Sequence, residues 1–523
     1  MILRLAAPAI LLSSLLLLPF LDKPFTIDDP LFLRAAQHAL IDPLHPADFE
    51  QVWNRGDRLR LSQYWLGGTL PAYVLMPVAA LGAREWIAHL YQWLFLCVFL
   101  LGCVAVARRL GCDRSQCTIV ALLAGANPVT LAMASTCMPD LMAATFAAVG
   151  IERVLAFREQ RRAITGIGAA LLLAAAILCR ATTAPLLLVA ALLMTPSSWK
   201  QIPQAMWPAA AAVAIAAAGA LVHRDTTGAG SLAGSFQTLT GLRNVPRNAV
   251  SYFAYQAATG PILLYWMLAR GRRTLLYAGG LVLLGLALTR VPSENLRQYA
   301  VPGALAICFL VALVDLLEEL RHFWPLALWL LCGLIALPYV YMSAKYLLPG
   351  IPAAALLVVF HAARVRQRRL PVTVGVLVAA GWIAGALVVV GDTTLAASGR
   401  AAAEREVGPI LARGGKVWAG GQWSFLEYAQ RAGAHPLANQ PPFPRPGDYV
   451  LISRLDYFGD FDTLRLQRQL LYSTRDERCG VFVLNRPLHA GFFSNRFGYL
   501  PFAVGCAELN RYDMYRVLDT LKN

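Results

Sequence analysis

Long apolar segments alternate with short basic loops over the first three quarters of the chain. A membrane-spanning helix needs about 20 apolar residues to cross a hydrocarbon core. About thirteen segments approach that length: residues 5–21, 86–107, 117–134, 139–157, 163–179, 181–195, 205–222, 248–269, 274–290, 299–317, 323–341, 345–363 and 370–391. The first follows a basic start and lacks a small-residue cleavage site, so we expect it to stay in the protein. The pattern predicts an α-helical polytopic membrane protein.

The pattern changes after residue 392, where mixed charge, Pro-Gly turns and short apolar runs replace the long apolar segments. Three segments are typical of β-strands and two of helices: residues 447–452, 480–484 and 502–505, and residues 398–413 and 424–432. The sequence therefore predicts two domains: a membrane domain over residues 1–392 and a small α/β domain over residues 393–523.

Composition and charge support this division and set an orientation. Hydrophobic residues make up 58% of the chain and charged residues 15%, against about half and a quarter in soluble domains. Lys and Arg of short loops stay on the cytoplasmic side. Counting from a cytoplasmic N-terminus places these groups inside: residues 108–114, 153–162, 200, 270–273 and 364–369. The net charge of +16 then reflects topology, not nucleic-acid binding.

The same alternation places the loop of residues 22–84 and the C-terminal domain outside, in the periplasm of a bacterial inner membrane. This loop contains Asp28 and Asp29, a few residues beyond the first span. Two adjacent carboxylates should raise the pKa of one of them, more so if it is partly desolvated, and this suits a general base near neutral pH. Asp before Pro30 also suits the start of a helix, and both roles are compatible.

Further ionisable and aromatic residues lie at the predicted outer edge of later spans. They are Asp140 after Pro139, Arg180 between two short spans, and the pairs Arg297 with Tyr299 and Lys345 with Tyr346. Ionisable groups at membrane depth are costly and point to function. Helix capping, snorkelling and an aromatic belt are the structural alternatives. Carboxylates facing cations suit a hydroxyl nucleophile and an anionic leaving group. No nucleotide-binding motif or metal-ligand pattern accompanies them.

In order and spacing these residues resemble the GT-C glycosyltransferases that use polyprenyl-phosphate sugars, in particular the bacterial lipid A aminoarabinose transferase and protein O-mannosyltransferase group. The motifs that carry the resemblance are Asp28-Asp29, Pro71-Ala72-Tyr73 through Leu81-Gly82, Pro139-Asp140, Arg180 and Lys345-Tyr346-Leu347-Leu348-Pro349. Two departures concern chemistry. Asp29 replaces a longer Glu, and Lys345 replaces an Arg that binds phosphate bidentately. Residues 297–302 offer a rival match to the last motif.

The resemblance implies sugar transfer from a polyprenyl monophosphate to a hydroxyl of a lipid, glycan or protein, with inversion at the anomeric carbon. Asp28 would be the general base, and Asp29 would orient the acceptor or tune Asp28. Three cations would stabilise the departing phosphate, and four residues would line the substrate pocket: Arg180, Arg297 and Lys345, and Asp140, Tyr299, Tyr346 and Tyr73. No cofactor is required; a divalent metal is compatible but not indicated.

Two other functions remain open. A polymerase or ligase that uses diphosphate-linked glycans would have its key residues in a later outer loop, and residues 223–247 contain Arg224, Arg243 and Arg247. A lipid or solute transporter would show internal repeats and charged groups at the membrane midplane. The sequence has no convincing repeat, and its unusual residues lie at one edge.

Two cysteines fall in the C-terminal domain, Cys479 and Cys506. If the domain faces an oxidising compartment, disulfides persist there. The segments that follow Cys479 and precede Cys506 are predicted strands, and neighbouring strands bring their side chains together. We therefore expect a disulfide between the two residues.

Overall fold

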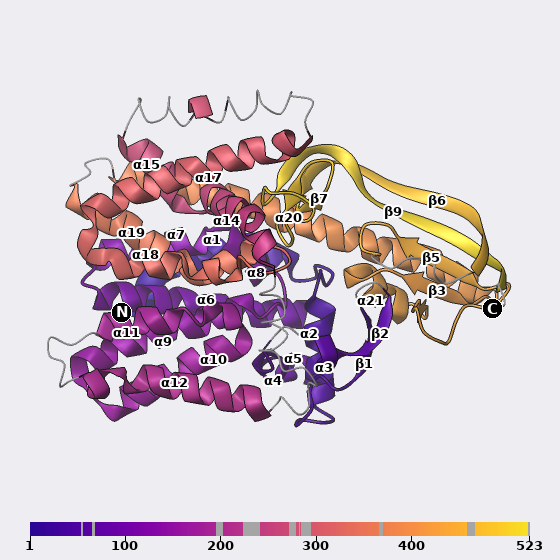
Figure 1. Cartoon of the computed structure of the whole chain (residues 1–523), viewed down its shortest axis with the longest axis horizontal. Helices are drawn as coiled ribbons and strands as arrows, with labels where there is room; N and C mark the ends of the chain where they lie inside the picture. The colour runs from indigo at the N-terminus through magenta and orange to yellow at the C-terminus, as the bar shows by residue number, and fades with distance from the viewer. Residues whose placement is uncertain are drawn as a thin grey trace.

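A computed structural model shows an elongated molecule with a bundle of helices at one end and a sheet domain at the other (Figure 1). It describes residues 1–53, 56–64, 68–194, 202–222, 241–270, 279–281, 283, 294–365, 370–457 and 466–520. The bundle contains α1 (Ile2–Leu17), α6 (Glu85–Arg109), α7 (Arg114–Gly125), α8 (Pro128–Ala134), α9 (Asp140–Gln160), α10 (Ala163–Cys179), α11 (Leu186–Met194), α12 (Ile202–Val222), α14 (Val245–Thr259), α15 (Pro261–Arg270), α17 (Glu294–Glu319), α18 (Trp324–Leu330), α19 (Ile351–Arg364) and α20 (Leu370–Ala412).

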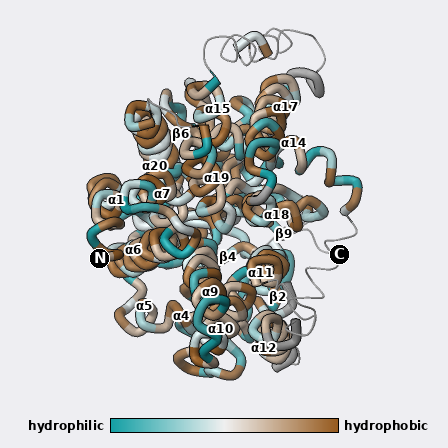
Figure 2. The backbone as a smooth tube through the Cα atoms, turned by 90° about the vertical axis from the view of Figure 1, so that its left-hand side faces the viewer, coloured by the Kyte–Doolittle hydropathy of each residue, from teal (hydrophilic) through white to brown (hydrophobic). Residues whose placement is uncertain are grey.

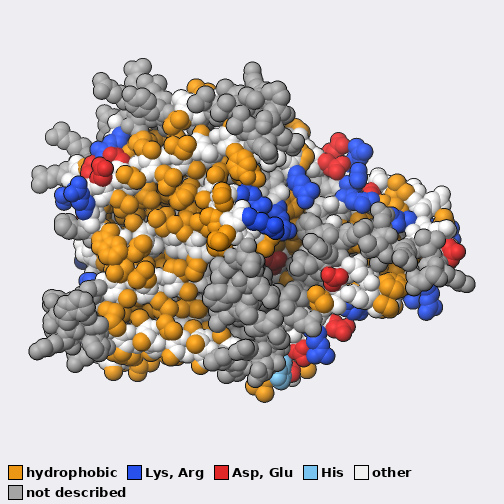
Figure 3. Space-filling view, viewed as in Figure 1, with side chains coloured by type: hydrophobic (Ala, Val, Ile, Leu, Met, Phe, Trp, Pro, Cys, Tyr) orange, Lys and Arg blue, Asp and Glu red, His pale blue; other side chains and the backbone are white. Residues whose placement is uncertain are grey.

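Apolar helices indicate a membrane protein, as the sequence predicts. Within the described residues, five helices are long and apolar enough to cross a membrane, or six if α7 and α8, bent by 63°, form one span. Apolar side chains cover the visible face of the bundle, and charged side chains gather at its ends (Figure 3). Seen from the free end of the bundle, the helix segments are mainly apolar in colour (Figure 2).

The predicted number of about thirteen spans is not confirmed. The predicted span 323–341 is broken, because α18 ends at Leu330 and the short 3-10 helix η7 (Cys332–Ala336) follows. The predicted span 181–195 is also divided, into η2 (Ala181–Thr183) and α11. Residues 274–290 lie mostly outside the described residues.

The first loop folds into short elements between the bundle and the sheet domain (Figure 1). They are α2 (Asp29–Ala39), the β1–β2 hairpin (Glu50–Trp53 and Asp57–Arg60), α3 (Leu61–Tyr64), α4 (Leu70–Val74) and α5 (Met76–Ala80). Polar contacts join this loop to the C-terminal domain: Arg34 pairs with Glu427 at 2.6 Å, and Phe25 N donates to the Tyr428 hydroxyl at 2.9 Å. The C-terminal domain therefore helps to hold this loop in place.

The C-terminal domain is a five-stranded sheet with strand order β4-β3-β5-β9-β6. Its elements are β3 (Val417–Gly420), α21 (Trp423–Arg431), β4 (His435–Pro436), β5 (Tyr449–Ser453), β6 (Leu466–Phe482), β7 (Leu484–Asn485), β8 (Ala490–Gly491) and β9 (Ala503–Thr520). Both predicted helices are present, but residues 398–413 are mostly the end of α20. That helix runs 43 residues and crosses the proposed domain boundary at residue 392.

Two glycines let α20 pack closely against the sheet domain. A Cβ at Gly391 would lie 2.9 Å from the Val481 carbonyl oxygen, and one at Gly399 would lie 2.9 Å from the Phe425 nitrogen. Glycine inside a helix costs about 1 kcal/mol relative to alanine. Here it permits β6 and α21 to contact the helix backbone.

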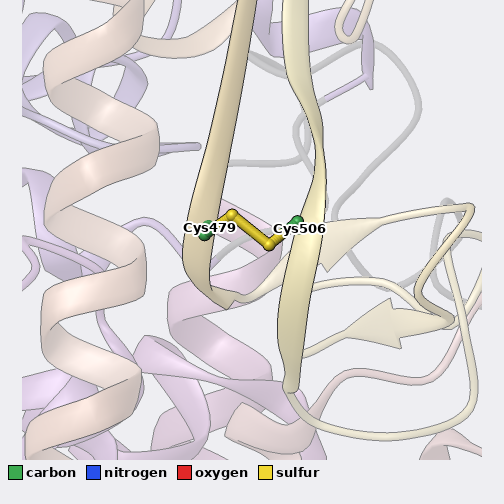
Figure 4. The surroundings of a disulfide bond; sticks show 2 residues. All are labelled: Cys479 and Cys506. Atoms are coloured by element: carbon green, nitrogen blue, oxygen red, sulfur yellow. A yellow bond between two sulfur atoms is a disulfide. The ribbon is translucent and has the colours of Figure 1, made fainter.

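Cys479 and Cys506 pair directly across β6 and β9 and form a disulfide, with Cα atoms 3.9 Å apart (Figure 4). The two strands extend well beyond the predicted segments 480–484 and 502–505. Most of β6 is solvent-exposed and polar, so its apolar pattern marks only the last residues of the strand.

Asp456 predicts a pH dependence of stability. Burial raises the pKa of this carboxyl from its ordinary value of 3.8 to about 7. The folded state therefore holds the proton more tightly than the unfolded state. Its stabilising contribution is complete below about pH 3.8 and is lost as the pH rises through about 7. Each unit of pKa difference between the folded and unfolded states corresponds to about 1.4 kcal/mol. A rise from 3.8 to about 7 therefore corresponds to a loss of roughly 4 kcal/mol.

Asp456→Asn should remove this dependence, so the variant should gain thermal stability over the unmodified chain at pH 8 more than at pH 5. Thermal unfolding of the purified full chain at both values measures the difference. Asp519→Asn, in the exposed end of β9, is the matched control. An equal effect of Asp456→Asn at both pH values would contradict the prediction.

Candidate active site between the bundle and the sheet domain

Asp28 and Asp29 occupy different environments. Asp29 begins α2 and is fully buried; its Oδ2 accepts from Thr26 N at 3.0 Å and its Oδ1 from Cys137 N at 2.7 Å. Asp28 occupies the N-cap position, but its side chain makes no capping hydrogen bond and is 25% exposed. Asp29 therefore holds the loop in place, while Asp28 is the carboxylate accessible to a substrate.

One carboxylate of the pair has a raised pKa, and burial, which the sequence reasoning treated as a secondary cause, is the main one. Burial raises the pKa of Asp29 to about 7, against the opposing effect of the Lys23 charge. The charge of Asp28 is not among the causes. Sequence proximity suggested repulsion between two carboxylates, whereas the fold separates them into a buried and an accessible group.

The backbone before Asp28 is strained. Ile27 has φ = 42°, a conformation that is unfavourable for a β-branched residue and costs on the order of 1–3 kcal/mol. Thr26 and Asp29 maintain it, because Asp29 N donates to Thr26 O at 2.9 Å and Thr26 Oγ1 donates to Asp392 Oδ1 at 2.8 Å. Such strain is often associated with functional sites. Here the hydrogen bonds that maintain the strained conformation also fix the backbone that carries Asp28.

Lys345 and Arg180 approach the acidic loop from other helices. Lys345, in the 3-10 helix η8 (Ala344–Gly350), lies 3.6 Å from Asp28 Oδ2 and is 3% exposed. Arg180 follows α10 and pairs bidentately with Asp140: Nε to Oδ1 at 2.9 Å and Nη2 to Oδ2 at 2.8 Å. Asp28 is close enough to act on the Arg180 charge. The fold therefore brings together four of the predicted residues.

Aromatic residues complete this cluster. Tyr346 is buried and contacts the Tyr339 ring edge-on, with centroids 6.0 Å apart. Burial, followed by the Asp28 charge, raises the pKa of Tyr341 to about 12, so its hydroxyl is protonated at neutral pH. The guanidinium of Arg496, from the C-terminal domain, lies 5.9 Å from the Tyr341 ring centroid. Sequence reasoning missed Tyr341 and Arg496, because only tertiary packing brings these two residues, which lie far apart in the sequence, together at this site.

A loop of the C-terminal domain is built into this region. Ala344 N donates to Phe492 O at 2.8 Å, next to Lys345. The buried Asn495 side chain donates to Asn248 Oδ1 and Ser251 Oγ, both at 2.9 Å, and accepts from Met342 N at 3.0 Å. The segment that carries Tyr341 and Lys345 is thus positioned by the C-terminal domain.

Two other predicted site residues make contacts in different places, and a third has a side chain outside the described part of the chain. Tyr73 donates its hydroxyl to Pro43 O at 2.6 Å within the first loop. Tyr299 stacks on Tyr499 of the C-terminal domain, with centroids 4.6 Å apart. The side chain of Arg297 lies outside the described residues. Beside Tyr499 a cavity of about 410 Å³ opens, lined by Gln298, Arg486, Pro487, His489, Asn495, Arg496, Phe497, Gly498 and Tyr499.

Comparison with solved structures shows the fold. The chain is similar to ArnT from Cupriavidus metallidurans bound to undecaprenyl phosphate, with a TM-score of 0.50 and 14% identity over 99% of both chains. This GT-C likeness confirms the fold that the sequence resemblance implied. No family model and no curated protein sequence matches the chain.

Weaker similarities involve two other proteins. The oligosaccharyltransferase AglB from Archaeoglobus fulgidus gives a TM-score of 0.48 at 10% identity, covering 86% of this chain and 69% of that one. The arabinofuranosyltransferase AftD from Mycobacteria gives 0.40 at 14% identity, covering 99% of this chain and 40% of that one.

Proposed function

We propose that the chain is a GT-C glycosyltransferase that transfers a sugar from a polyprenyl monophosphate to a hydroxyl acceptor at the periplasmic face of a bacterial inner membrane. One observation carries the proposal. Asp28, which is the partly exposed carboxylate of the acidic pair, lies 3.6 Å from Lys345 and close enough to Arg180 for the two charges to interact. A base and phosphate-binding cations are the groups that this transfer needs. The ArnT likeness supports the fold, and ArnT itself binds undecaprenyl phosphate.

In the proposed reaction, Asp28 takes the proton of the acceptor hydroxyl. The acceptor oxygen forms a bond to the anomeric carbon from the face opposite the phosphate, and the bond between that carbon and the phosphate oxygen breaks. The electron pair leaves with the polyprenyl phosphate, and the configuration inverts. Lys345 and Arg180 stabilise the departing phosphate by charge-assisted hydrogen bonds. Asp140 fixes Nε and Nη2 of Arg180, and Nη1 takes no part in that pair.

We place the acceptor entrance at the cavity between α17 and the C-terminal domain. Arg496 both lines this cavity and contacts Tyr341, which lies close to Asp28. The Tyr299–Tyr499 stack forms a flat aromatic surface beside it, suited to the apolar face of a sugar ring.

The proposal is tested with the full chain purified in detergent, a polyprenyl-monophosphate sugar and a panel of lipid, glycan and peptide acceptors. We expect release of polyprenyl monophosphate that depends on the chain and on an acceptor. Turnover only with a polyprenyl-diphosphate glycan would instead support the ligase or polymerase alternative. Sugar or lipid movement across proteoliposomes without bond cleavage would support a transporter.

Arg180→Ala should impair use of the donor more than use of the acceptor. Loss of a hydrogen-bonded charge on phosphate typically removes about 1.5–3 kcal/mol, or roughly 10- to 100-fold in kcat/KM for the donor. The KM for the acceptor should change little. Arg158→Ala, exposed at the far end of α9, is the matched control. If donor dependence is unchanged, Arg180 acts as the structural partner of Asp140, and Lys345 is the main phosphate-binding group.

A further inference from the structure

Three potential metal ligands from distant parts of the sequence meet beneath the candidate active site. They are Asp29 at the start of α2, His89 in the second turn of α6, and Cys137 between α8 and α9. One ligand atom from each lies within 4.8 Å of the others, and all three residues are buried. The spacing of 29, 89 and 137 forms no local motif, which is why the sequence did not indicate a metal.

The hydrogen bonding of His89 leaves one ring nitrogen ready to bind a metal. Its Nδ1 lies 2.8 Å from the Leu21 carbonyl oxygen, which can only accept, so Nδ1 carries the proton. Nε2 then has a free lone pair. In the described part of the chain this buried atom has no hydrogen-bond partner. A buried polar atom without a partner is unfavourable. Metal-binding histidines characteristically donate their second ring N–H to a carbonyl in this way.

We propose that Asp29, His89 and Cys137 bind a divalent transition metal, with zinc the best match. Carboxylate, imidazole and thiolate are the three ligand types that zinc uses. Zinc bond lengths place tetrahedral oxygen, nitrogen and sulfur ligand atoms about 3.3–3.6 Å apart. The ligand atoms now lie within 4.8 Å of one another, so they need to close by about 1.5 Å or less. Three protein ligands leave a fourth position for water.

The charges in this region balance once the metal is bound. Binding releases the Cys137 thiol proton and, where present, the Asp29 carboxyl proton to solvent. One thiolate and one carboxylate then neutralise the two positive charges of the ion. The nearby Lys23 ammonium does not add an unpaired charge, because it pairs with Asp392 at 2.5 Å. A neutral buried site avoids the large desolvation penalty of an uncompensated ion.

The ion would act as a positioning element. Asp29 adjoins Asp28, and Cys137 lies three residues before Asp140, which holds Arg180. A metal at this place would join the loop that carries the proposed base to the segment that fixes a phosphate-binding cation. The metal proposal does not depend on the proposed transfer activity, because its test measures binding directly.

The experiment uses the full chain in detergent, stripped with a chelator and titrated with Co²⁺ as a spectroscopic substitute for zinc. We expect about one equivalent to bind per chain, with a thiolate-to-cobalt charge-transfer band, and competition by Zn²⁺. Cys137→Ser should abolish the band, and His89→Gln should weaken Co²⁺ binding at least 10-fold, in line with loss of a direct ligand. Cys103→Ser changes a different buried cysteine, which lies in α6, and should leave the band and the Co²⁺ affinity unchanged.

Two results would overturn the proposal. One is the absence of a thiolate band in the unmodified chain with excess Co²⁺, an outcome that needs no variant to fold. The other is a band that persists in Cys137→Ser, which would assign the thiolate to a different cysteine.

Discussion

Asp28→Asn should reduce sugar transfer by a factor of about 10²–10⁴ while the protein folds normally. The substitution keeps the size of the side chain but removes the group that accepts the acceptor's proton, and general-base catalysis typically contributes this factor. Stability should change little, because Asp28 makes no capping hydrogen bond and its contact with Lys345 is at 3.6 Å. The decisive quantity is kcat, measured with both substrates saturating.

The matched control for Asp28→Asn is Asp48→Asn, which removes a carboxylate of the same loop that pairs with Arg60 at the surface. This control should retain full turnover. Retention of more than about a tenth of kcat by Asp28→Asn would exclude Asp28 as the base. A loss accompanied by misfolding would be resolved by Asp28→Glu, which restores a carboxylate and should recover part of kcat if the carboxylate itself is required.

Lys23→Met should destabilise the protein by about 3–5 kcal/mol, because it leaves the buried Asp392 carboxylate without its partner. The ammonium of Lys23 lies 2.5 Å from Asp392 Oδ2 and also donates to Ser135 O at 2.6 Å, and both charged side chains are fully buried. Asp392 additionally accepts from Thr26, next to the strained Ile27. Transfer activity should therefore fall together with thermal stability.

A double variant separates the charge from the packing. Lys23→Met with Asp392→Leu replaces the pair by apolar side chains, and such replacements are often neutral or stabilising. It should unfold at a higher temperature than Lys23→Met alone. Arg60→Gln breaks the surface pair between Arg60 and Asp48, whose side chains are 59% and 33% exposed, and should cost only about 0–1 kcal/mol. If Lys23→Met is as mild as this control, the buried pair contributes little.

The length of the apolar segments predicted most of the helices, because a helix that crosses a membrane needs a continuous apolar stretch. It also predicted that Asp28, Asp140, Arg180 and Lys345 share one end of the bundle, since each lies where a helix starts or ends on the same side. It failed where helices break, as between α18 and η7, because short apolar segments at a break have the same composition as a continuous span.

Contacts between distant segments account for the rest of what the sequence did not reveal. Lys23 and Asp392 are separated by 369 positions, and Asp29, His89 and Cys137 meet although they come from three separate segments of the chain. Arg496 approaches Tyr341 only because Asn495 is anchored in the bundle. Most of β6 carries polar residues on exposed faces, so no apolar alternation indicated its length, whereas β9 buries Tyr512, Met514 and Val517.

The uninterrupted helix α20 limits how the protein can open to exchange substrates. Its 43 residues span about 65 Å at 1.5 Å per residue, from the bundle to the sheet domain. Asp392 lies near the middle of this helix and holds Lys23 and Thr26. A hinge motion of the sheet domain would have to bend the helix and disturb that buried contact. Access for a lipid donor and an acceptor should therefore depend on rearrangement of short segments around the site, with the two domains moving as one body.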